Sequence, residues 1–296
     1  MALRCLALGD IALEIDASIP DSFTDINAHR LYQLPVDVRI GGTAAHFASH
    51  AQSLLGPSTI VGTVGNDIAG KFLIQQLQES KLELFVSIED ESETSKIIMV
   101  YDACSPINHR ILIVNNPNAN DKFSKRHLDL CTNQLFNTDI LFVSGHNARS
   151  EPRWSTSLMA MEIVSQKGGV VVFDLVPHDL YETITFDTLK TWTKHVSVLV
   201  AEVATLRRFL HFGHPAELID RELVERTLKD VIDIFPVLIL GYGPNNYEYQ
   251  CIATRDKVSF YETGFPSLPV KTGIGEWLVV NALDKLFSYS NSNSKI

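Results

Sequence analysis

The chain contains few cysteines, and they lie too far apart to form a recognisable structural site. Four cysteines occur in 296 residues, and no two of them have the CxxC spacing of zinc or redox motifs. They are Cys5, Cys104, Cys131 and Cys251. This pattern argues against a disulfide-rich secreted scaffold and is typical of reduced thiols, so we expect a cytoplasmic protein.

Long apolar runs and an excess of positive charge are also missing. No stretch approaches the roughly 18 apolar residues of a membrane-spanning helix, and residues 1–6 lack the apolar core of a signal peptide. Lysine and arginine number 25 against 35 acidic residues, which gives a net charge of −10. Because nucleic acids and anionic membranes attract basic surfaces, we expect neither as a partner. Any phosphate site must therefore be local, built from backbone amides and a few cations.

The composition does allow a sizeable core, since 45% of the residues are hydrophobic and 20% are charged. Short apolar runs bounded by Gly, Asp or Pro predict buried strands at 3–8, 60–64, 140–143, 170–173, 196–200 and 237–240. Helical patterns such as 44–55 and 154–164 lie between them. This alternation predicts an α/β fold with a mainly parallel sheet covered on both faces. We expect a single domain over residues 1–287.

Two segments interrupt this alternation. Residues from about 15 to 40 are mixed and polar, and residues from about 86 to 114 contain two runs typical of paired strands, 96–101 and 110–114. We expect them to form a small antiparallel flap, or lid, over the active end of the sheet. The Ser- and Asn-rich residues 288–296 predict a disordered tail.

The best clue to chemistry is Gly273-Ile274-Gly275-Glu276, which runs directly into an apolar helical stretch. Two glycines allow a tight turn, and the free amides of a first helical turn can hold an anion. A carboxylate facing such an anion hole could take a proton from a hydroxyl that attacks a phosphoryl group. The alternative is that this Gly and acidic residue only cap the helix.

Two other patterns are weaker. The segment from Gly65 to Lys71 fits the P-loop spacing, but Phe72 stands where a P-loop needs Ser or Thr for Mg²⁺. His46 and His50 share one face of the predicted helix 44–55, as metal ligands would, but no third ligand is evident. We therefore predict no protein-built metal site.

Acidic residues and glycines follow the first two predicted β–α units. Gly9 and Asp10 close the first strand, and Glu14 and Asp16 come shortly after. Carboxylates at the carboxyl end of a parallel strand lie where α/β folds bind ligands, or they are solvated loop residues. Gly41-Gly42-Thr43 opens the next helix and suits either close approach of a ligand or a simple turn with Thr43 as N-cap.

Taken in order, these pieces resemble the ribokinase-like (PfkB) carbohydrate and nucleoside kinases. The matching motifs are Gly9-Asp10 with Glu14, Gly41-Gly42-Thr43-Ala44-Ala45-His46, the glycines and Asp67 within 62–70, Ser144-Gly145, Phe173-Asp174, Leu240-Gly241 and Thr272-Gly273-Ile274-Gly275-Glu276. The resemblance covers residues 3 to about 287. It implies a three-layer α/β/α ribokinase-like fold with a mainly parallel central sheet and a small β-lid.

The resemblance also implies an activity and its site residues. It implies ATP-dependent phosphoryl transfer, with Mg²⁺, to a hydroxyl of a sugar, sugar-like molecule or nucleoside held between lid and sheet. Glu276 would be the base, and Gly273, Ile274 and Gly275 the anion hole. The acceptor would contact Glu14, Gly41, Gly42 and His46, and the nucleotide would contact Gly241, Lys271 and Thr272. A homodimer formed through the lid is a further expectation.

Several positions depart from the family pattern. The base is usually Asp, and the added methylene of Glu276 moves the carboxylate by roughly 1 to 1.5 Å, a displacement that can cost about 10²-fold in rate. The family's Asn-x-x-Glu motif is missing from residues 200–204, although Glu202 could substitute. Only 20 residues follow Glu276. The alternative function is therefore a catalytically degenerate member that binds a sugar, nucleoside or protein partner without phosphoryl transfer.

Overall fold

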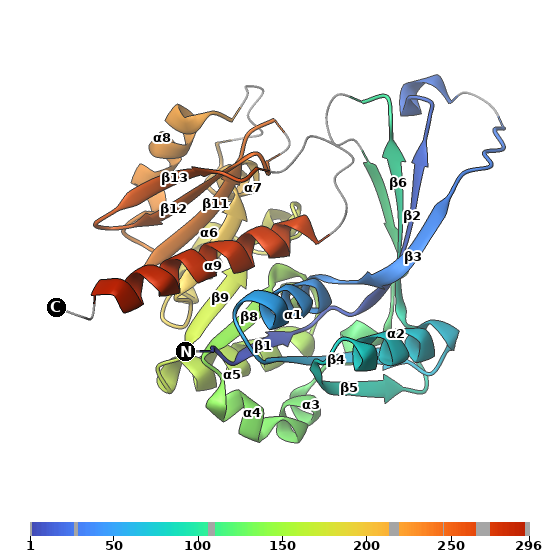
Figure 1. Ribbon diagram of the computed structural model, residues 1–296, viewed down its shortest axis with the longest axis horizontal. Helices are drawn as coiled ribbons and strands as arrows, with labels where there is room; N and C mark the ends of the chain where they lie inside the picture. The colour runs from blue at the N-terminus through green and yellow to red at the C-terminus, as the bar shows by residue number, and fades with distance from the viewer. Residues whose placement is uncertain are drawn as a thin grey trace.

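The computed structural model describes residues 2–26, 29–105, 110–212, 219–244, 246–264 and 273–293, and its largest element is a nine-stranded sheet (Figure 1). The strand order is β13-β12-β11-β10-β9-β8-β1-β4-β5. The strands from β5 to β11 pair in parallel, and β12 and β13 are antiparallel. Their bounds are β1 Cys5–Leu8, β4 Ser58–Gly65, β5 Glu83–Glu89, β8 Ile140–Ser144, β9 Val170–Asp174, β10 Val198–Glu202, β11 Val237–Tyr242, β12 Tyr249–Thr254 and β13 Val258–Glu262.

Helices cover both faces of this sheet (Figure 1). One face carries α1 Thr43–Leu54, α2 Ile68–Glu79 and α9 Ile274–Asn293. The other carries α3 Lys125–Leu130, α4 Thr132–Asn137, α5 Arg153–Gln166, α6 Phe186–Thr191, α7 Val203–Phe209 and α8 Arg221–Val231. Short 3₁₀ turns are η1 Phe23–Asp25, η2 Ala119–Lys122, η3 Gly145–Arg149 and η4 Leu180–Glu182.

The central strands of the main sheet are apolar throughout because they contribute side chains to two hydrophobic clusters, one on each face of the sheet. In β1, Cys5 and Ala7 pack into the cluster beneath α1 and α9, whereas Leu6 and Leu8 pack into the cluster beneath α5. Successive side chains of a strand point to opposite faces, so a strand buried on both sides must be apolar throughout. All six predicted strands and the helix pattern between them are confirmed. The antiparallel strands β12 and β13 were not predicted.

A second sheet of four strands, ordered β3-β2-β6-β7, forms the lid (Figure 1). Its strands are β2 Ala12–Ile19, β3 Val36–Gly41, β6 Ser95–Asp102 and β7 Arg110–Val114. The expected β6–β7 antiparallel pair is confirmed, but β2 and β6 are parallel, so the prediction of an antiparallel flap was wrong. The reason is that β2 follows the carboxyl end of β1 and β6 follows the carboxyl end of β5. Because β1 and β5 point the same way, the lid strands that follow them also run in the same direction. Residues 86–89, expected in the lid, belong to β5.

The two faces of the lid differ: one, called the polar face below, carries the charged site residues together with aliphatic side chains of β6 and β7, and the other is mostly aliphatic. Registered neighbours share a face, so Glu14 and Asp16 of β2 lie with Arg39 of β3 and with Tyr101 and Arg110 at the β6–β7 pair. The opposite face is apolar, and part of it is exposed. Its exposed members are Val36, Val38, Ile98, Ile111 and Ile113, each between 41% and 56% accessible.

Helix α9 reaches into residues 288–296, where the sequence predicted a disordered tail. Helix α9 runs without interruption from Ile274 to Asn293, and residues 294–296 lie outside the described part of the chain. Once a helix is nucleated, each further residue adds a backbone hydrogen bond, so serines and asparagines can extend an apolar helix that already exists. Within the described residues, none of the helices is both long and apolar enough to cross a membrane.

Candidate active site

The candidate site lies where the lid strand β2 meets the helix α1, and it centres on Glu14. This carboxylate is buried, with only 3% of the residue exposed. It accepts hydrogen bonds from His46 Nε2 at 3.2 Å, Arg39 Nε at 3.4 Å and the Gly42 amide at 3.4 Å. Arg39 also pairs with Asp16. The structure therefore brings together two residues that were predicted to lie in one pocket, Glu14 and His46.

The pairing with Glu14 sets the charge of His46. Burial alone would lower the pKa of this imidazole, but the hydrogen bond from His46 to Glu14 and the negative charges of Glu276 and Glu14 outweigh burial. The pKa of His46 is therefore raised above its ordinary value of 6.5. At neutral pH this favours a cationic imidazole between two carboxylates, which suits a residue that holds the polar groups of the site in place.

The two glycines before α1 are required by the packing of the protein itself. A Cβ at Gly41 would overlap the side chain of Glu14, and a Cβ at Gly42 would overlap the Asp10 carbonyl. Gly42 also has φ +96°, which favours glycine. Gly42, not Thr43, is the N-cap of α1, so that detail of the prediction was wrong. The Thr43 hydroxyl instead donates to Ser144 Oγ, at 2.9 Å, or to Asp10 Oδ2, at 3.4 Å.

Asp10 is held inside the fold rather than free in a loop. Burial favours its neutral form, but an ion pair with Arg153 and the nearby His146 lower its pKa below the ordinary value. Arg153 also donates to Asn147 Oδ1 at 2.7 Å, and Asn147 donates to the Leu8 carbonyl at 3.0 Å. This network fixes the end of β1, from which the chain enters the lid.

The turn before α9 rests on α1. Gly273 has φ +81°, and a Cβ there would lie 2.8 Å from His46 Nδ1. His50 Nε2 donates to the Gly273 carbonyl at 3.1 Å, as does the Trp277 amide at 3.0 Å. The two histidines thus brace this turn, and among the described residues no group of three or more His, Cys, Asp or Glu side chains could hold a metal ion. Lys271 and Thr272 lie outside the described residues.

Glu276 stands in the first turn of α9 and is 8% exposed. Burial raises its pKa above the ordinary value, and the positive charge of His46 only partly opposes this effect. Ile274 and Gly275 complete the turn, and no described atom lies within 4 Å of the place that a Cβ on Gly275 would occupy. Glu276 therefore follows directly on first-turn amides and on the open space beside Gly275.

Two further carboxylates lie close by, at the carboxyl ends of β9 and β10. Burial raises the pKa of Asp174 well above its ordinary value, and the charges of Glu276 and Glu202 raise it further. Burial also raises the pKa of Glu202, which accepts from Asn246 Nδ2 at 2.9 Å and lies 3.4 Å from His178 Nδ1. Neighbouring Gly241 lets the loop after β11 fold back, because a Cβ there would lie 2.6 Å from the Asn246 carbonyl.

Sequence reasoning did not identify Arg39, and it noted Asp16 and His50 without the roles that they have in the fold. Arg39 and Asp16 neutralise one another beside Glu14, and His50 supports the turn before α9. The signal for the first two was the period-two spacing of polar residues in the lid strands, since alternate residues of a strand share one face. No local pattern distinguishes His50, because its partner carbonyl is 223 residues away.

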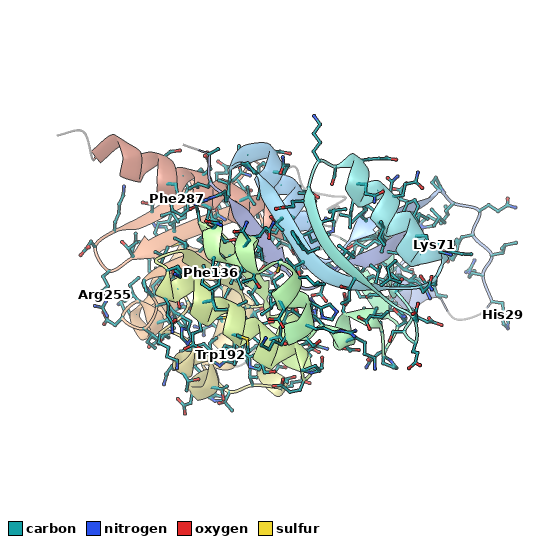
Figure 2. All side chains as sticks on the ribbon, turned by 90° about the horizontal axis from the view of Figure 1, so that it is seen from below. His29, Lys71, Phe136, Trp192, Arg255 and Phe287 are labelled. Atoms are coloured by element: carbon teal, nitrogen blue, oxygen red, sulfur yellow. The ribbon has the colours of Figure 1, made fainter. Side chains whose placement is uncertain are left out.

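The segment with P-loop spacing joins a strand to a helix and helps to hold the lid. Residues 65–71 run from the end of β4 into the first turn of α2, where Asp67 caps the helix by accepting from the Gly70 amide at 2.8 Å. Asp67 also accepts from the amide and hydroxyl of Thr94, at 3.0 and 2.6 Å, which ties α2 to the base of the lid. Lys71 is exposed on α2, far along the edge of the molecule (Figure 2).

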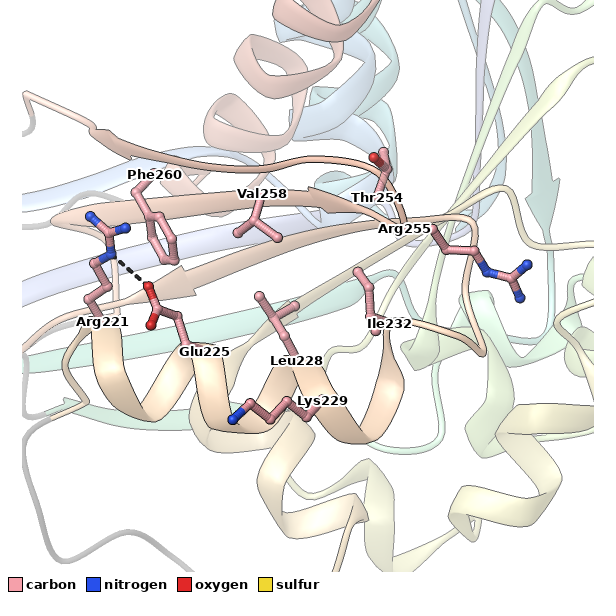
Figure 3. A pocket seen from close by; sticks show the side chains of 9 residues that line it. All are labelled: Arg221, Glu225, Leu228, Lys229, Ile232, Thr254, Arg255, Val258 and Phe260. Carbon is pink, nitrogen blue, oxygen red and sulfur yellow. Dashed lines mark hydrogen bonds and ion pairs between the residues drawn. The ribbon is translucent and has the colours of Figure 1, made fainter.

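A groove of about 430 Å³ lies elsewhere, between α8 and the β12–β13 hairpin (Figure 3). Its floor is apolar, and Arg221 at its end pairs with Glu225 and lies over the Phe260 ring. The lining residues are Arg221, Glu225, Leu228, Lys229, Ile232, Thr254, Arg255, Val258 and Phe260. None of them is a predicted site residue, and α8 packs on the face of the sheet opposite α1 and α9. The groove is therefore separate from the candidate site.

The order of the motifs and the geometry of the site agree with a comparison to known families. The sequence model of one family, described as "pfkB family carbohydrate kinase", matches residues 7–232 of this chain. The chain belongs to this family. A fructokinase of Salmonella typhimurium is 26% identical over 226 residues, which is 76% of this chain. The match spans 62% of that fructokinase, less than two thirds of its length.

Solved structures show the same fold. The adenosine kinase of Sinorhizobium meliloti superposes with a TM-score of 0.79 at 14% identity, over 97% of this chain and 88% of that one. A protein of E. coli described as a putative Ribokinase II in complex with ATP and Mg²⁺ gives a TM-score of 0.70 at 18% identity, over 96% and 86% of the two chains. The predicted three-layer ribokinase-like fold with its β-lid is confirmed.

The charge on Asp174 should destabilise the folded protein. Because the folded pKa is raised, the group contributes no penalty below the unfolded value near 3.8, and stability falls as the pH rises from there through the folded pKa. Asp174→Asn should therefore gain about 1 kcal/mol or more over wild type at neutral pH, with a smaller gain at pH 4. Denaturant unfolding in EDTA would measure this, with the exposed Asp129→Asn as control. A gain independent of pH would contradict the assignment.

The two glycines of the α9 turn should respond oppositely to alanine. Gly273→Ala combines a positive φ with a contact to His46, so it should lower stability by about 1–3 kcal/mol. Gly275→Ala is its matched control, because it meets no described atom and alanine favours a helix by about 0.5–1 kcal/mol. Thermal unfolding of both variants would check this difference. Equal losses would show that the turn before α9 is packed differently.

Proposed function

We propose that the protein transfers the γ-phosphoryl group of ATP to a hydroxyl of a sugar or sugar-like molecule. The observation that carries this proposal is the position of Glu276. It is a buried carboxylate in the first turn of a helix, beside the Glu14–His46 pair that joins the lid to α1. A base beside an amide-lined turn, facing a buried polar pocket, suits attack of a hydroxyl on a phosphoryl group.

The acceptor would lie under the polar face of the lid. Carboxylates and arginines that already hold one another in place can accept from and donate to several hydroxyls at little entropic cost. Glu14 and His46 would contact the acceptor directly. Gly41 and Gly42 would contribute through their backbone, because the space beside their Cα atoms is filled by Glu14 and Asp10. The kinship to a curated fructokinase supports a carbohydrate acceptor.

The nucleotide would lie over the ends of β10 and β11, with its phosphates toward Gly273–Gly275. Lys271, Thr272 and Gly241 remain the proposed contacts. The described residues fit a divalent cation such as Mg²⁺, because Asp174 and Glu202 are buried carboxylates at this edge, and Asp174 forms no ion pair in the described part of the chain. Mg²⁺ binds through one or two carboxylates and the substrate phosphates, so no closed protein cage is needed. When bound, it would neutralise charge on the phosphate oxygens.

In the proposed step the residues of the chain have separate tasks. Glu276 accepts the proton of the acceptor hydroxyl as its oxygen attacks the phosphorus. The raised pKa makes Glu276 a better base than an exposed glutamate, although it must first lose its own proton. The rate should therefore rise with pH through the raised pKa of Glu276. The first-turn amides of α9 hold the phosphoryl oxygens, and the lid excludes water.

One observation favours the second function, binding without transfer. The carboxylate of Glu202 already has Asn246 and His178 as partners, so its availability to a cation is reduced. If this carboxylate stays engaged, the protein would bind an acceptor and lack the means to order the phosphates. The two functions differ in whether any acceptor is phosphorylated, which the following experiment measures.

Removing the proposed base separates these functions. Glu276→Gln should lower kcat by about 10²-fold or more and leave acceptor affinity within a few-fold, as expected for an interaction made only in the transition state. Turnover would be measured as ADP release with a panel of neutral sugars and nucleosides. Equal kcat in wild type and Glu276→Gln would contradict the assignment. Glu276→Asp tests the length of the side chain: a gain marks a displaced base, and a loss marks a site adapted to Glu.

We also propose that two copies of the chain associate through the apolar face of the lid. This face is a contiguous set of aliphatic side chains on an otherwise acidic protein, and such patches mark association surfaces. Ile111→Glu should shift wild-type dimers to monomers in sedimentation, because it places a charge in a desolvated interface. Leu130→Glu, at an isolated exposed leucine of α3, is the control. A monomeric wild type at high concentration would exclude this dimer.

A further inference from the structure

Arg110 is a second arginine of the lid, and it has no part in the proton transfer assigned to Glu276. It is the first residue of β7, and it pairs with Tyr101 of β6 across the antiparallel ladder. Through the β2–β6 register, Tyr101 shares its face with Ser18, Asp16 and Glu14. Arg110 therefore lies on the polar face of the lid, the face that carries Glu14 toward His46.

The two arginines of this face differ in their partners. Arg39 is neutralised by Glu14 and Asp16. Arg110 forms no ion pair with any residue in the described part of the chain, and its neighbour is the phenol of Tyr101. It is also partly buried. The planar guanidinium carries five N–H donors, and no carboxylate in the described part of the chain pairs with them, so an added anion could accept from several at once.

Arg110 lies close enough to the carboxyl edge of the main sheet to interact electrostatically with groups there. Burial disfavours the charged form of Arg110, but Tyr247, Tyr101 and Glu202 outweigh it and raise the pKa. In return, the charge of Arg110 partly opposes the burial that raises the pKa values of Glu202 and Glu276. A lid residue thus acts on two carboxylates, one at the end of β10 and one in the first turn of α9. The space between them is where a phosphoryl group would pass from nucleotide to acceptor.

We propose that Arg110 is a catalytic residue that binds the phosphoryl group during its transfer. This inference rests on the proposed function. The acceptor oxygen forms a bond to the γ-phosphorus, the bond from that phosphorus to the bridging oxygen breaks, and ADP leaves with the electron pair. The acceptor proton goes to Glu276. The planar guanidinium donates two parallel hydrogen bonds to the oxygens on which negative charge is shared.

The placement of this cation on the lid makes transfer depend on lid position. The lid would bring Arg110 to the phosphoryl group only when it is closed over an acceptor. ATP bound without acceptor would lack the cation, which disfavours transfer to water.

The test compares Arg110→Met and Arg110→Lys with Arg126→Met. Arg126 is exposed on α3 and paired with Glu89, so its variant removes the same charge far from the site. Arg110→Met should lower kcat by about 10²- to 10³-fold and leave the KM of the acceptor within a few-fold, because the contact strengthens in the transition state. Arg110→Lys should recover part of kcat as a point charge. Arg126→Met should match wild type.

Two results would overturn the proposal. One is a kcat of Arg110→Met within a few-fold of wild type. The other is a raised KM for the acceptor with unchanged kcat, which would assign Arg110 to an anionic group of the acceptor instead. Either result leaves phosphoryl transfer itself intact, so the two proposals fail separately.

A binding measurement covers the case in which wild type phosphorylates no acceptor. Calorimetry with magnesium tripolyphosphate, a probe without adenine or sugar, should show weaker binding to Arg110→Met than to wild type and Arg126→Met. Equal binding by all three proteins would overturn the role of Arg110 whatever the activity. Arg110→Lys, which keeps the charge, should bind the probe better than Arg110→Met, and circular dichroism would verify that each variant is folded.

Discussion

The hydrogen bond between Glu14 and His46 joins the three parts from which the site is built. Glu14 belongs to the lid, His46 belongs to α1, and the His46 ring lies against Gly273 at the start of α9. Each partner is shaped by the other: the carboxylate raises the pKa of the imidazole, and Gly41 has no side chain because Glu14 fills its space. Loss of this contact would separate the proposed acceptor site from the proposed base.

Negative charge is the second constraint on the site. Glu14, Asp174, Glu202 and Glu276 gather at one edge of the sheet, and burial or mutual repulsion raises the pKa values of the last three. The protein balances this charge only partly, with His46, Arg39 and Arg110. Such a site is poorly satisfied when empty, and a cation with its phosphates would complete it. The excess of buried negative charge lowers the stability of the folded protein. The same excess would favour binding of a nucleotide together with its magnesium ion.

The sequence predicted the sheet well because its strands are buried on both faces and therefore read as uninterrupted apolar runs. It failed at β12, where Gln250 leaves a run of only three apolar residues. The proximity of Glu14 and His46 could be predicted, because the order of the motifs assigns both residues to the acceptor site. The environment of Asp174 could not, because its neighbours Glu202 and Glu276 come from distant parts of the chain and only the fold brings them together.

The two-faced lid limits how this protein can change over generations. In β2, Glu14 and Asp16 alternate with Leu13 and Ile15, so one face carries the polar site and the other is apolar. Inserting or deleting one residue within the strand would exchange the faces beyond that point. Carboxylates would move to the apolar side, and aliphatic side chains would face the polar pocket. Length variation in the lid should therefore be confined to the connections between its strands, while the strands diverge by substitution alone.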